Sequence, residues 1–171
     1  MTAAHSALIA IDWGTSNLRA SLLDANGNAI ETRSAPGGVM SVKDGLFADA
    51  LLSLCGDWIH ERSGALIASG MVGSRQGWKE AAYLNCPAGV EEAAAQLTRV
   101  DVRPGVILHI LPGLTCRNTD GQDDVMRGKE TQMLGADLAP GSISSTRAPD
   151  GATTRGQWLV AQKAGLLEHT A

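Results

Sequence analysis

One carboxylate, followed at once by small and hydroxylated residues, is the first feature of the sequence that could do chemistry. The run from Ile9 to Arg19 reads IAIDWGTSNLR, with Asp12 at the end of an apolar stretch. Glycine lets the backbone approach an anion closely, and the N–H groups of such a turn can face a phosphate. Asp12 could then hold Mg²⁺ through water, because this ion gives up its hydration shell reluctantly. The alternative is an ordinary Asx turn, in which Asp12 and Thr15 bond only their own backbone.

A second group of candidates lies in residues 124–136, which read DVMRGKETQMLGA. Arg127 offers a planar fork of donors suited to a carboxylate. Glu130, on the neighbouring face of a predicted helix, could orient or deprotonate a substrate hydroxyl. The alternative is an Arg–Glu pair on a solvated helix. We interpret Asp123 and Asp124 as N-terminal caps of that helix rather than as a catalytic base.

A glycine-rich loop over residues 70–77 supplies the third group. Ser74 and Arg75 are candidate polar contacts to a small ligand, and Trp78 is a candidate apolar wall. A long surface turn explains the three glycines of this loop equally well.

Short apolar runs and helical periods predict the elements that must position these residues. Two strands flank the Asp12 turn and a third returns after another turn, so the first thirty-odd residues form an antiparallel meander. We expect strands at 7–11, 18–23, 29–33, 65–69 and 106–111, and helices from 46 to about 63, at 90–97 and at 124–138. This order predicts an α/β fold, with a mixed sheet of about five strands and helices on its faces.

Composition and charge narrow the function classes. The 171 residues carry a net charge of -4, and the 14 basic residues form no run, so we expect no nucleic-acid partner. Asp12 interrupts the first apolar stretch, so neither a signal peptide nor a membrane span is expected. The three cysteines, Cys55, Cys86 and Cys116, are widely spaced and odd in number. They are typical of packing thiols in a reducing compartment, and we expect a cytoplasmic protein.

The motifs together resemble one family. The pattern Asp-x-Gly-Thr-Ser-x-x-x-Arg is similar to the first phosphate element of the superfamily of actin, the heat-shock ATPases and the sugar kinases. Residues 69–78 (SGMVGSRQGW), 111–114 (LPGL) and 124–136 resemble 2-dehydro-3-deoxygalactonokinases, in the same order and at similar spacing. The resemblance covers residues 7–141 and implies an actin-like ATPase domain of ribonuclease H-like fold. Lys129 stands where the family usually has a second Glu.

The resemblance also implies an activity and a set of site residues. The activity is ATP-dependent phosphorylation of 2-dehydro-3-deoxy-D-galactonate to its 6-phosphate in galactonate catabolism, with Mg²⁺. Catalytic roles fall to Asp12 and Glu130, with Asp12 also holding the metal. The ATP phosphates would be contacted by Gly14, Thr15, Ser16, Asn17 and Arg19. The substrate would be contacted by Ser74, Arg75, Trp78 and Arg127.

After residue 141 the sequence departs from the family. The second phosphate-contacting element, Pro-Gly-Thr-His-x-Lys-Trp, is replaced by SSTRAPDGATTRGQW at 144–158, and residues 142–157 show no clear period. We therefore interpret residues 1–141 as the N-terminal actin-like domain and 142–171 as a divergent or truncated tail, and we expect the residues beyond 157 to be loosely held or disordered. On this interpretation the second, adenine-binding domain is absent and the isolated chain is not a competent kinase.

Three functions remain open at this stage. They are the galactonate-pathway kinase, a non-catalytic ligand-binding or regulatory module of the same fold, and a kinase for the gluconate epimer of the substrate. The last is open because one inverted hydroxyl needs few changed contacts. A small sugar acid is the expected partner, and the sequence leaves open a homo-oligomer.

Overall fold

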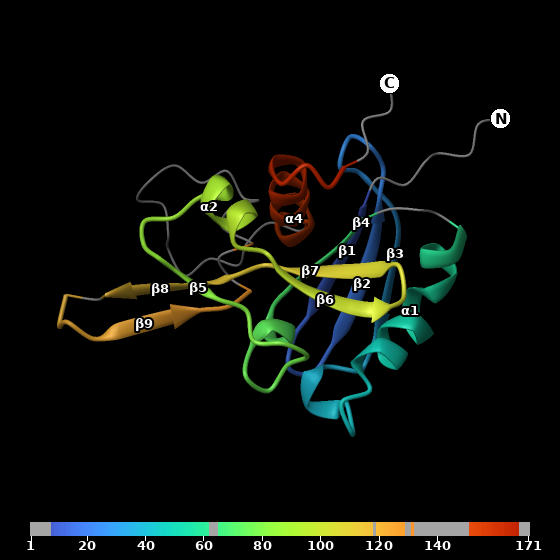
Figure 1. Ribbon diagram of the computed structural model, residues 1–171, viewed down its shortest axis with the longest axis horizontal. Helices are drawn as coiled ribbons and strands as arrows, with labels where there is room; N and C mark the ends of the chain where they lie inside the picture. Colours follow the sequence, from blue (N-terminus) through green and yellow to red (C-terminus); the bar gives the residue numbers. More distant parts are fainter. Residues whose placement is uncertain (1–7, 62–64, 118, 129–130, 132–150, 168–171) are drawn as a thin grey trace.

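A six-stranded mixed sheet forms the centre of the computed structural model, which describes residues 8–61, 65–117, 119–128, 131 and 151–167 (Figure 1). Its strand order is β3-β2-β1-β4-β7-β6. The strands are β1 (Leu8–Trp13), β2 (Leu18–Leu23), β3 (Ala29–Ala35), β4 (Ala65–Ser69), β6 (Thr98–Arg103) and β7 (Val106–Ile110). The predicted α/β class with a mixed sheet is confirmed. The strand β6, which the sequence analysis missed, lies antiparallel to β7 at one edge.

The antiparallel part of this sheet comes from the first 35 residues, as their short connections require. β1 pairs with β2, and β2 with β3, both antiparallel, whereas β1–β4 and β4–β7 are parallel pairs. β1 is therefore central, and its carboxyl end lies beside the carboxyl end of β4. Loops that leave these two ends meet at one edge of the sheet.

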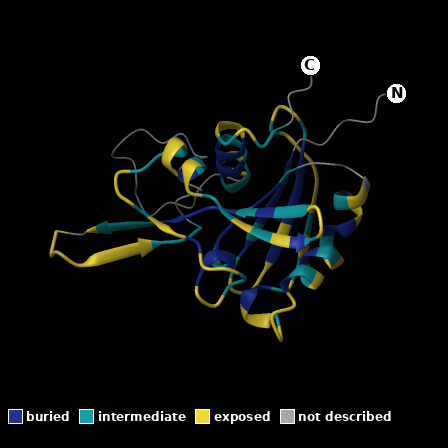
Figure 2. Ribbon diagram, viewed as in Figure 1, coloured by how far each residue is buried: buried dark blue, intermediate teal, exposed yellow. Residues whose placement is uncertain are grey.

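Each face of the sheet has its own apolar core, because side chains alternate along β1. Ile9 and Ile11 pack in the cluster that includes Leu51, and Leu8 and Ala10 pack in the cluster that includes Val160. The helices concerned are α1 (Phe47–Glu61) on the first face, and α2 (Val90–Ala95) and α4 (Ala152–Lys163) on the second. Figure 2 shows the resulting buried strands between partly exposed helices.

A second, three-stranded sheet projects beside the first. It contains β5 (Tyr83–Asn85), β8 (Gly113–Arg117) and β9 (Asp123–Met126) in the order β5-β8-β9. The β8–β9 hairpin extends away from the body of the molecule in Figure 1, and much of β9 is exposed in Figure 2.

β9 corrects the prediction of a helix beginning at residue 124. Val125 pairs with Thr115 and Met126 with Leu114 across an antiparallel ladder, so cross-strand pairing prevails over local helix preference. Asp123 and Asp124 are therefore strand residues, and they cap no helix. Residues 129–130 and 132–150 lie outside the described part of the chain.

α4 corrects part of the expectation for the tail. Residues 152–163 form a helix whose Val160 and Ala161 are fully buried against the second face of the sheet. The expectation of a loosely held segment was therefore wrong for residues 158–163, and the helix begins earlier, at Ala152, inside the stretch without a clear period. The remaining tail residues, 142–150 and 168–171, lie outside the described ranges.

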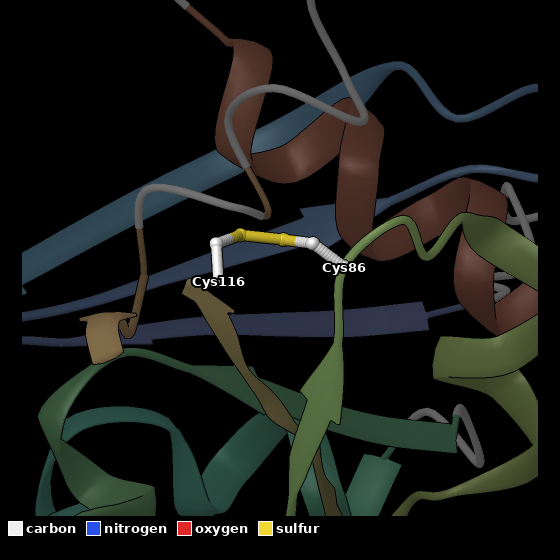
Figure 3. The surroundings of a disulfide bond; sticks show 2 residues. All are labelled: Cys86 and Cys116. Carbon is white, nitrogen blue, oxygen red and sulfur yellow. A yellow bond between two sulfur atoms is a disulfide. The ribbon is translucent and has the colours of Figure 1, made fainter. Parts of the chain in front are cut away.

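The cysteines also differ from expectation. Cys86 and Cys116 form a disulfide (Figure 3), with their Cα atoms 5.1 Å apart. The parallel pairing of Asn85 with Thr115 brings the two following residues together, which their separation of 30 positions conceals. Only Cys55 is a buried packing thiol, and burial raises its pKa to about 12. No helix within the described ranges is both long enough and apolar enough to cross a membrane.

Candidate functional site at the carboxyl ends of β1 and β4

Asp12 lies near the end of β1, between two neighbouring strands. It stands opposite Arg19 of β2 and beside Ser69, the last residue of β4. Burial raises the pKa of the Asp12 carboxyl above its ordinary value, and the positive charge of Arg19 opposes this shift. Asp12 is half-buried, whereas Arg19 is exposed. The carboxylate thus lies where the central strands β1 and β4 end, rather than in the core, as the sequence predicted.

The turn after Asp12 is narrow and braced from outside. The N–H of Gly14 donates to the carbonyl oxygen of Asn17 at 3.0 Å. The 3-10 turn η1 (Val39–Ser41) holds the other side, because Val39 N–H donates to the Gly14 carbonyl at 3.0 Å. Gly38 packs so closely that an added Cβ would lie 2.1 Å from the Thr15 carbonyl oxygen. The turn is therefore held in one conformation by backbone contacts.

The same turn presents unused donors. Thr15, Ser16 and Asn17 are exposed. Within the described ranges their backbone N–H groups donate to no protein acceptor. Successive N–H groups in a turn can bind an anion. Of the three nitrogens, that of Ser16 lies against Gly38, whose added Cβ would be 2.3 Å from it. Of the two interpretations of the turn, this arrangement favours the anion site, because Asp12 accepts no hydrogen bond from the turn among those described.

Gly70 closes the site from the β4 side. Its φ of +99° lies in the region that favours glycine, and an added Cβ would lie 2.7 Å from the carbonyl oxygen of Trp13. That same Cβ position is 3.6 Å from Oδ1 of Asp12. The loop leaving β4 thus passes directly over the end of β1.

The three loop residues predicted to contact substrate are not gathered at one point. Ser74 is buried, and its hydroxyl donates to the carbonyl of Met71 at 2.6 Å, which closes its own turn. Arg75 is exposed, with its Nε 3.6 Å from Oε1 of Glu80. Trp78 stacks on Phe47 at a centroid distance of 5.9 Å. In this conformation the loop serves packing more than ligand contact, and the substrate roles of Ser74, Arg75 and Trp78 stay predictions.

Arg127 lies across the other side of the same loop. Its Nη2 donates to the carbonyl of Ala81 at 2.9 Å, and its Cζ lies 4.3 Å from the centre of the Tyr83 ring. An added Cβ on Gly73 would lie 2.7 Å from Nη1 of Arg127. Nε and Nη1 are both buried without a hydrogen-bond acceptor among the described residues. Two of the three guanidinium nitrogens therefore have no acceptor among the described residues, whereas Nη2 is hydrogen-bonded.

Gly128 connects Arg127 to the Asp12 end of the sheet. Its φ is +98°, and an added Cβ would lie 3.3 Å from the Cα of Gly70. Gly70 consequently lies between the Asp12 carboxylate and the segment that carries Arg127. Glu130, predicted to be catalytic, falls outside the described residues.

Gln157 is a site residue that sequence reasoning missed. It is fully buried on α4, and its Nε2 donates both to the carbonyl of Ile11 and to Oγ of Ser69, the latter at 3.0 Å. It thereby ties β1 to β4 at the point where Asp12 leaves the sheet. Its Oε1 is buried without a described partner. The signal that could have revealed it is a lone amide among the apolar residues Trp158, Leu159 and Val160.

The residues present fit a Mg²⁺ ion held by few protein ligands. Within the described ranges there is no group of three His, Cys, Asp or Glu side chains that could hold a metal. Mg²⁺ is commonly bound by one or two carboxylates together with phosphate oxygens and water, so Asp12 beside an anion-binding turn suits it. The site offers no protein cage for a metal without phosphate.

Comparison with known proteins identifies relatives of this chain. The family model described as 2-keto-3-deoxy-galactonokinase matches residues 12–169. The 2-dehydro-3-deoxygalactonokinase of Escherichia coli K12 is 43% identical over 136 residues, covering 79% of this chain and 44% of that protein. The "Probable 2-dehydro-3-deoxygalactonokinase DgoK1" of Rhizobium meliloti 1021 is 38% identical over 154 residues, covering 88% and 48%. The chain therefore spans about half the length of these two relatives.

A solved structure agrees with the fold. The crystal structure of "a putative 2-dehydro-3-deoxygalactonokinase protein" from Sinorhizobium meliloti matches with a TM-score of 0.63 and 35% sequence identity. The match covers 75% of this chain and 41% of that one. The family match extends past residue 141, where the resemblance seen in the sequence ended.

Proposed function

The chain belongs to the 2-keto-3-deoxy-galactonokinase family, and we propose that it takes part in ATP- and Mg²⁺-dependent phosphorylation of 2-dehydro-3-deoxy-D-galactonate. The product would be the 6-phosphate, formed in galactonate catabolism in the cytoplasm. The observation that carries the proposal is the pairing of a half-buried Asp12 carboxylate with a braced turn of free N–H groups. Phosphoryl transfer depends mostly on positioning and charge stabilisation, which are the two things this edge of the sheet supplies.

Asp12 and the turn after it would have different roles toward the ATP phosphates. The N–H groups of Thr15, Ser16 and Asn17 would bind phosphate oxygens, and the Arg19 guanidinium beside them would add positive charge. Asp12 would hold Mg²⁺, which when bound neutralises charge on the phosphates. Gly70 leaves space over the carboxylate, because any side chain at that position would meet the end of β1.

Arg127 would bind the carboxylate of the sugar acid. Two buried nitrogens without acceptors are costly, so an anion that supplies acceptors to Nε and Nη1 would be favoured. Both atoms are covered in this conformation, and the carboxylate would reach them when the 70–77 loop and the end of β9 separate. Glu130 keeps its proposed role toward the attacked hydroxyl.

The test is a turnover assay joined to a binding measurement. The chain, joined to the remaining half of a full-length relative, is incubated with ATP, Mg²⁺ and either 2-dehydro-3-deoxy-D-galactonate or its gluconate epimer. ADP is measured, and binding of each acid is followed by calorimetry. ADP formation that depends on the galactonate acid and is lost in Asp12→Asn supports the kinase. Asp101→Asn is the matched control, because Asp101 is an exposed carboxylate on the edge strand β6.

The other outcomes separate the alternatives. Faster turnover of the epimer would move the substrate assignment to the gluconate acid. Binding of the acid without ADP formation would favour a ligand-binding module of the same fold. Neither binding nor turnover of either acid would overturn the proposal.

A further inference from the structure

The Cys86–Cys116 pair lies at the end of a very short edge strand. β5 has three residues and pairs only with β8, through Tyr83–Gly113, Leu84–Leu114 and Asn85–Thr115. The ladder continues by one bond, from Cys86 N–H to the carbonyl of Thr115 at 3.0 Å. The next step brings the two cysteine Cα atoms to 5.1 Å, within the range of about 4.4–6.8 Å that a disulfide spans.

These two residues are more exposed than the third cysteine. Cys86 is exposed and Cys116 is half-buried. Cys55 is fully buried, its thiol donates to the carbonyl of Leu51, and burial raises its pKa to about 12. Thiol exchange requires access, which the exposed Cys86 has and the fully buried Cys55 lacks.

The opposite end of the same short segment contacts Arg127. The Tyr83 ring lies under the guanidinium, and the Ala81 carbonyl accepts a hydrogen bond from it. An added Cβ on Gly113 would lie 2.7 Å from the Tyr83 ring, so β8 also fixes that ring in place. Residues 81–86 thus carry the contacts of Arg127 at one end and the disulfide at the other.

We propose that Cys86 and Cys116 form a reversible redox modification site whose closure fastens β5 to β8 and holds residues 81–86 against Arg127. The co-reactant is a small-molecule disulfide such as oxidised glutathione. The thiolate of the exposed Cys86 attacks one glutathione sulfur, and one glutathione leaves. The Cys116 sulfur then attacks Cys86 in the mixed disulfide, and the second glutathione leaves. Two electrons pass to glutathione, and the two thiol protons end on the two released thiols.

The reduced state follows from the same geometry. Without the cross-link, β5 is held by its short ladder to β8, by Leu84 in the second core and by the contact of Tyr83 with Arg127. An edge strand of three residues held in this way opens more readily than the central strands. Residues 81–86 then leave β8 more often, and the contacts of Tyr83 and Ala81 with Arg127 loosen with them. The inference concerns the strand and its cysteines, and it stands whether or not Arg127 binds a sugar acid.

The experiment follows the cross-link and the strand separately. The chain is equilibrated in buffers of increasing ratio of oxidised to reduced glutathione, quenched in acid, unfolded and alkylated, and its mass is measured. Of its three cysteines, all are alkylated in the reduced form and only Cys55 in the cross-linked form. Amide exchange at Cys86 is measured by NMR in the same buffers. We expect reversible conversion, with exchange at this amide slowed about tenfold or more on oxidation.

Two cysteine variants test whether the change in exchange depends on the Cys86–Cys116 cross-link. In Cys116→Ser the Cys86 amide should exchange fast in every buffer, whereas Cys55→Ala should respond as the unmodified chain does. The proposal is overturned if the cross-linked form appears at no ratio, if only a glutathione adduct accumulates, or if the cross-link forms without slowing exchange at Cys86. Because no sugar acid or ATP is present, failure of the proposed kinase function cannot produce any of these results.

Discussion

The pKa of Asp12 reflects the partly buried position of its carboxyl group. Its strand places it beside Ser69 and opposite Arg19, where burial outweighs the nearby positive charge and raises the pKa of the carboxyl. A carboxylate kept at this cost near the end of a strand is more readily explained by a bound cation than by folding. The sequence identified Asp12 because a lone acidic residue ends an apolar strand.

Asp12→Asn should show this cost as a pH dependence of stability. The folded pKa is raised, so protonation of Asp12 stabilises the folded chain fully below the ordinary pKa, and that contribution is lost as pH rises through the raised value. The free energy of unfolding of the unmodified chain, minus that of Asp12→Asn, should therefore fall across this window. Urea unfolding of both proteins between pH 3 and pH 7 (about four units) measures the difference. A difference that rises with pH would contradict the burial of this carboxyl.

Arg127→Lys tests the proposed role of the guanidinium in binding the sugar acid. Lysine keeps the positive charge but loses the planar fork, so the KM for the sugar acid should rise about tenfold or more, roughly 1.4 kcal/mol. The KM for ATP should stay unchanged in the same steady-state assay. Arg117→Lys is the control, because Arg117 is exposed on β8 and pairs only loosely, at 3.6 Å, with Asp123. An effect on ATP alone would place Arg127 elsewhere in the site.

Residues such as Gln157 and Ser74 show where sequence reasoning ends. The types and spacing of the residues indicated Asp12 and the turn after it, because a carboxylate can bind a metal ion and a glycine-containing turn can bind a phosphate. They could not show that the Ser74 hydroxyl would be used by its own loop, or that a distant amide would join Ile11 to Ser69. Such contacts depend on which segments meet in three dimensions, and no local pattern records them.

At the scale of elements, hydrophobic pattern predicted the strands and helices with strong periods and missed those without. The strands β1, β2, β4 and β7 are nearly continuous apolar runs, and α1 has a clear apolar stripe. In contrast, β5, β8 and β9 are short and mixed in polarity, so their pairing partners decide their structure. α4 escaped detection because its buried face consists largely of small and polar residues: Ala152, Gly156, Gln157, Val160 and Ala161.

Two helical glycines allow this explanation of α4 to be tested. An added Cβ on Gly156 would lie 2.1 Å from the carbonyl oxygen of Thr131, so Gly156→Ala must displace backbone. We expect it to lower the free energy of unfolding by about 1–3 kcal/mol. In α1, an added Cβ on Gly56 would lie 3.5 Å from the Cβ of Leu52, an ordinary contact. Gly56→Ala should be neutral or stabilising by up to about 1 kcal/mol, because alanine favours helix.

Urea titrations of the two variants give the comparison. The substitution is the same and both positions are buried, but Gly56 follows a kink of α1 at Cys55, whose φ and ψ are not helical. The comparison therefore rests on the close approach of Thr131 at Gly156 and not on equal helix propensity. Equal effects would mean that α4 does not press against Thr131. A clear loss for Gly156→Ala alone would fix α4 to the segment that follows Arg127.

At the scale of the whole molecule, β1 makes two cores depend on each other. Ile9 and Ile11 enter one cluster and Leu8 and Ala10 the other, so neither face can lose its core without disturbing the same strand. Of the two covering layers, α1 was predicted from its sequence and α4 was not. The question is therefore whether α4 unfolds together with the sheet and α1 in one cooperative transition.

Substituting one buried residue in each of the two cores tests this cooperativity. Leu51 of α1 and Val160 of α4 are both fully buried, in different clusters. Leu51→Ala should cost about 2–5 kcal/mol and Val160→Ala, which removes less, about 1–3 kcal/mol. If β1 couples the faces, each variant should shift one single transition, seen at the same urea concentration by tryptophan fluorescence and by far-ultraviolet circular dichroism. The double variant should lose about the sum of the two costs, since the sites lie on opposite faces and share no partner. A separate early transition in Val160→Ala, with the remaining transition unchanged, would contradict this coupling. It would show that α4 unfolds independently of the sheet and that the Gln157 link between β1 and β4 does not stabilise the sheet.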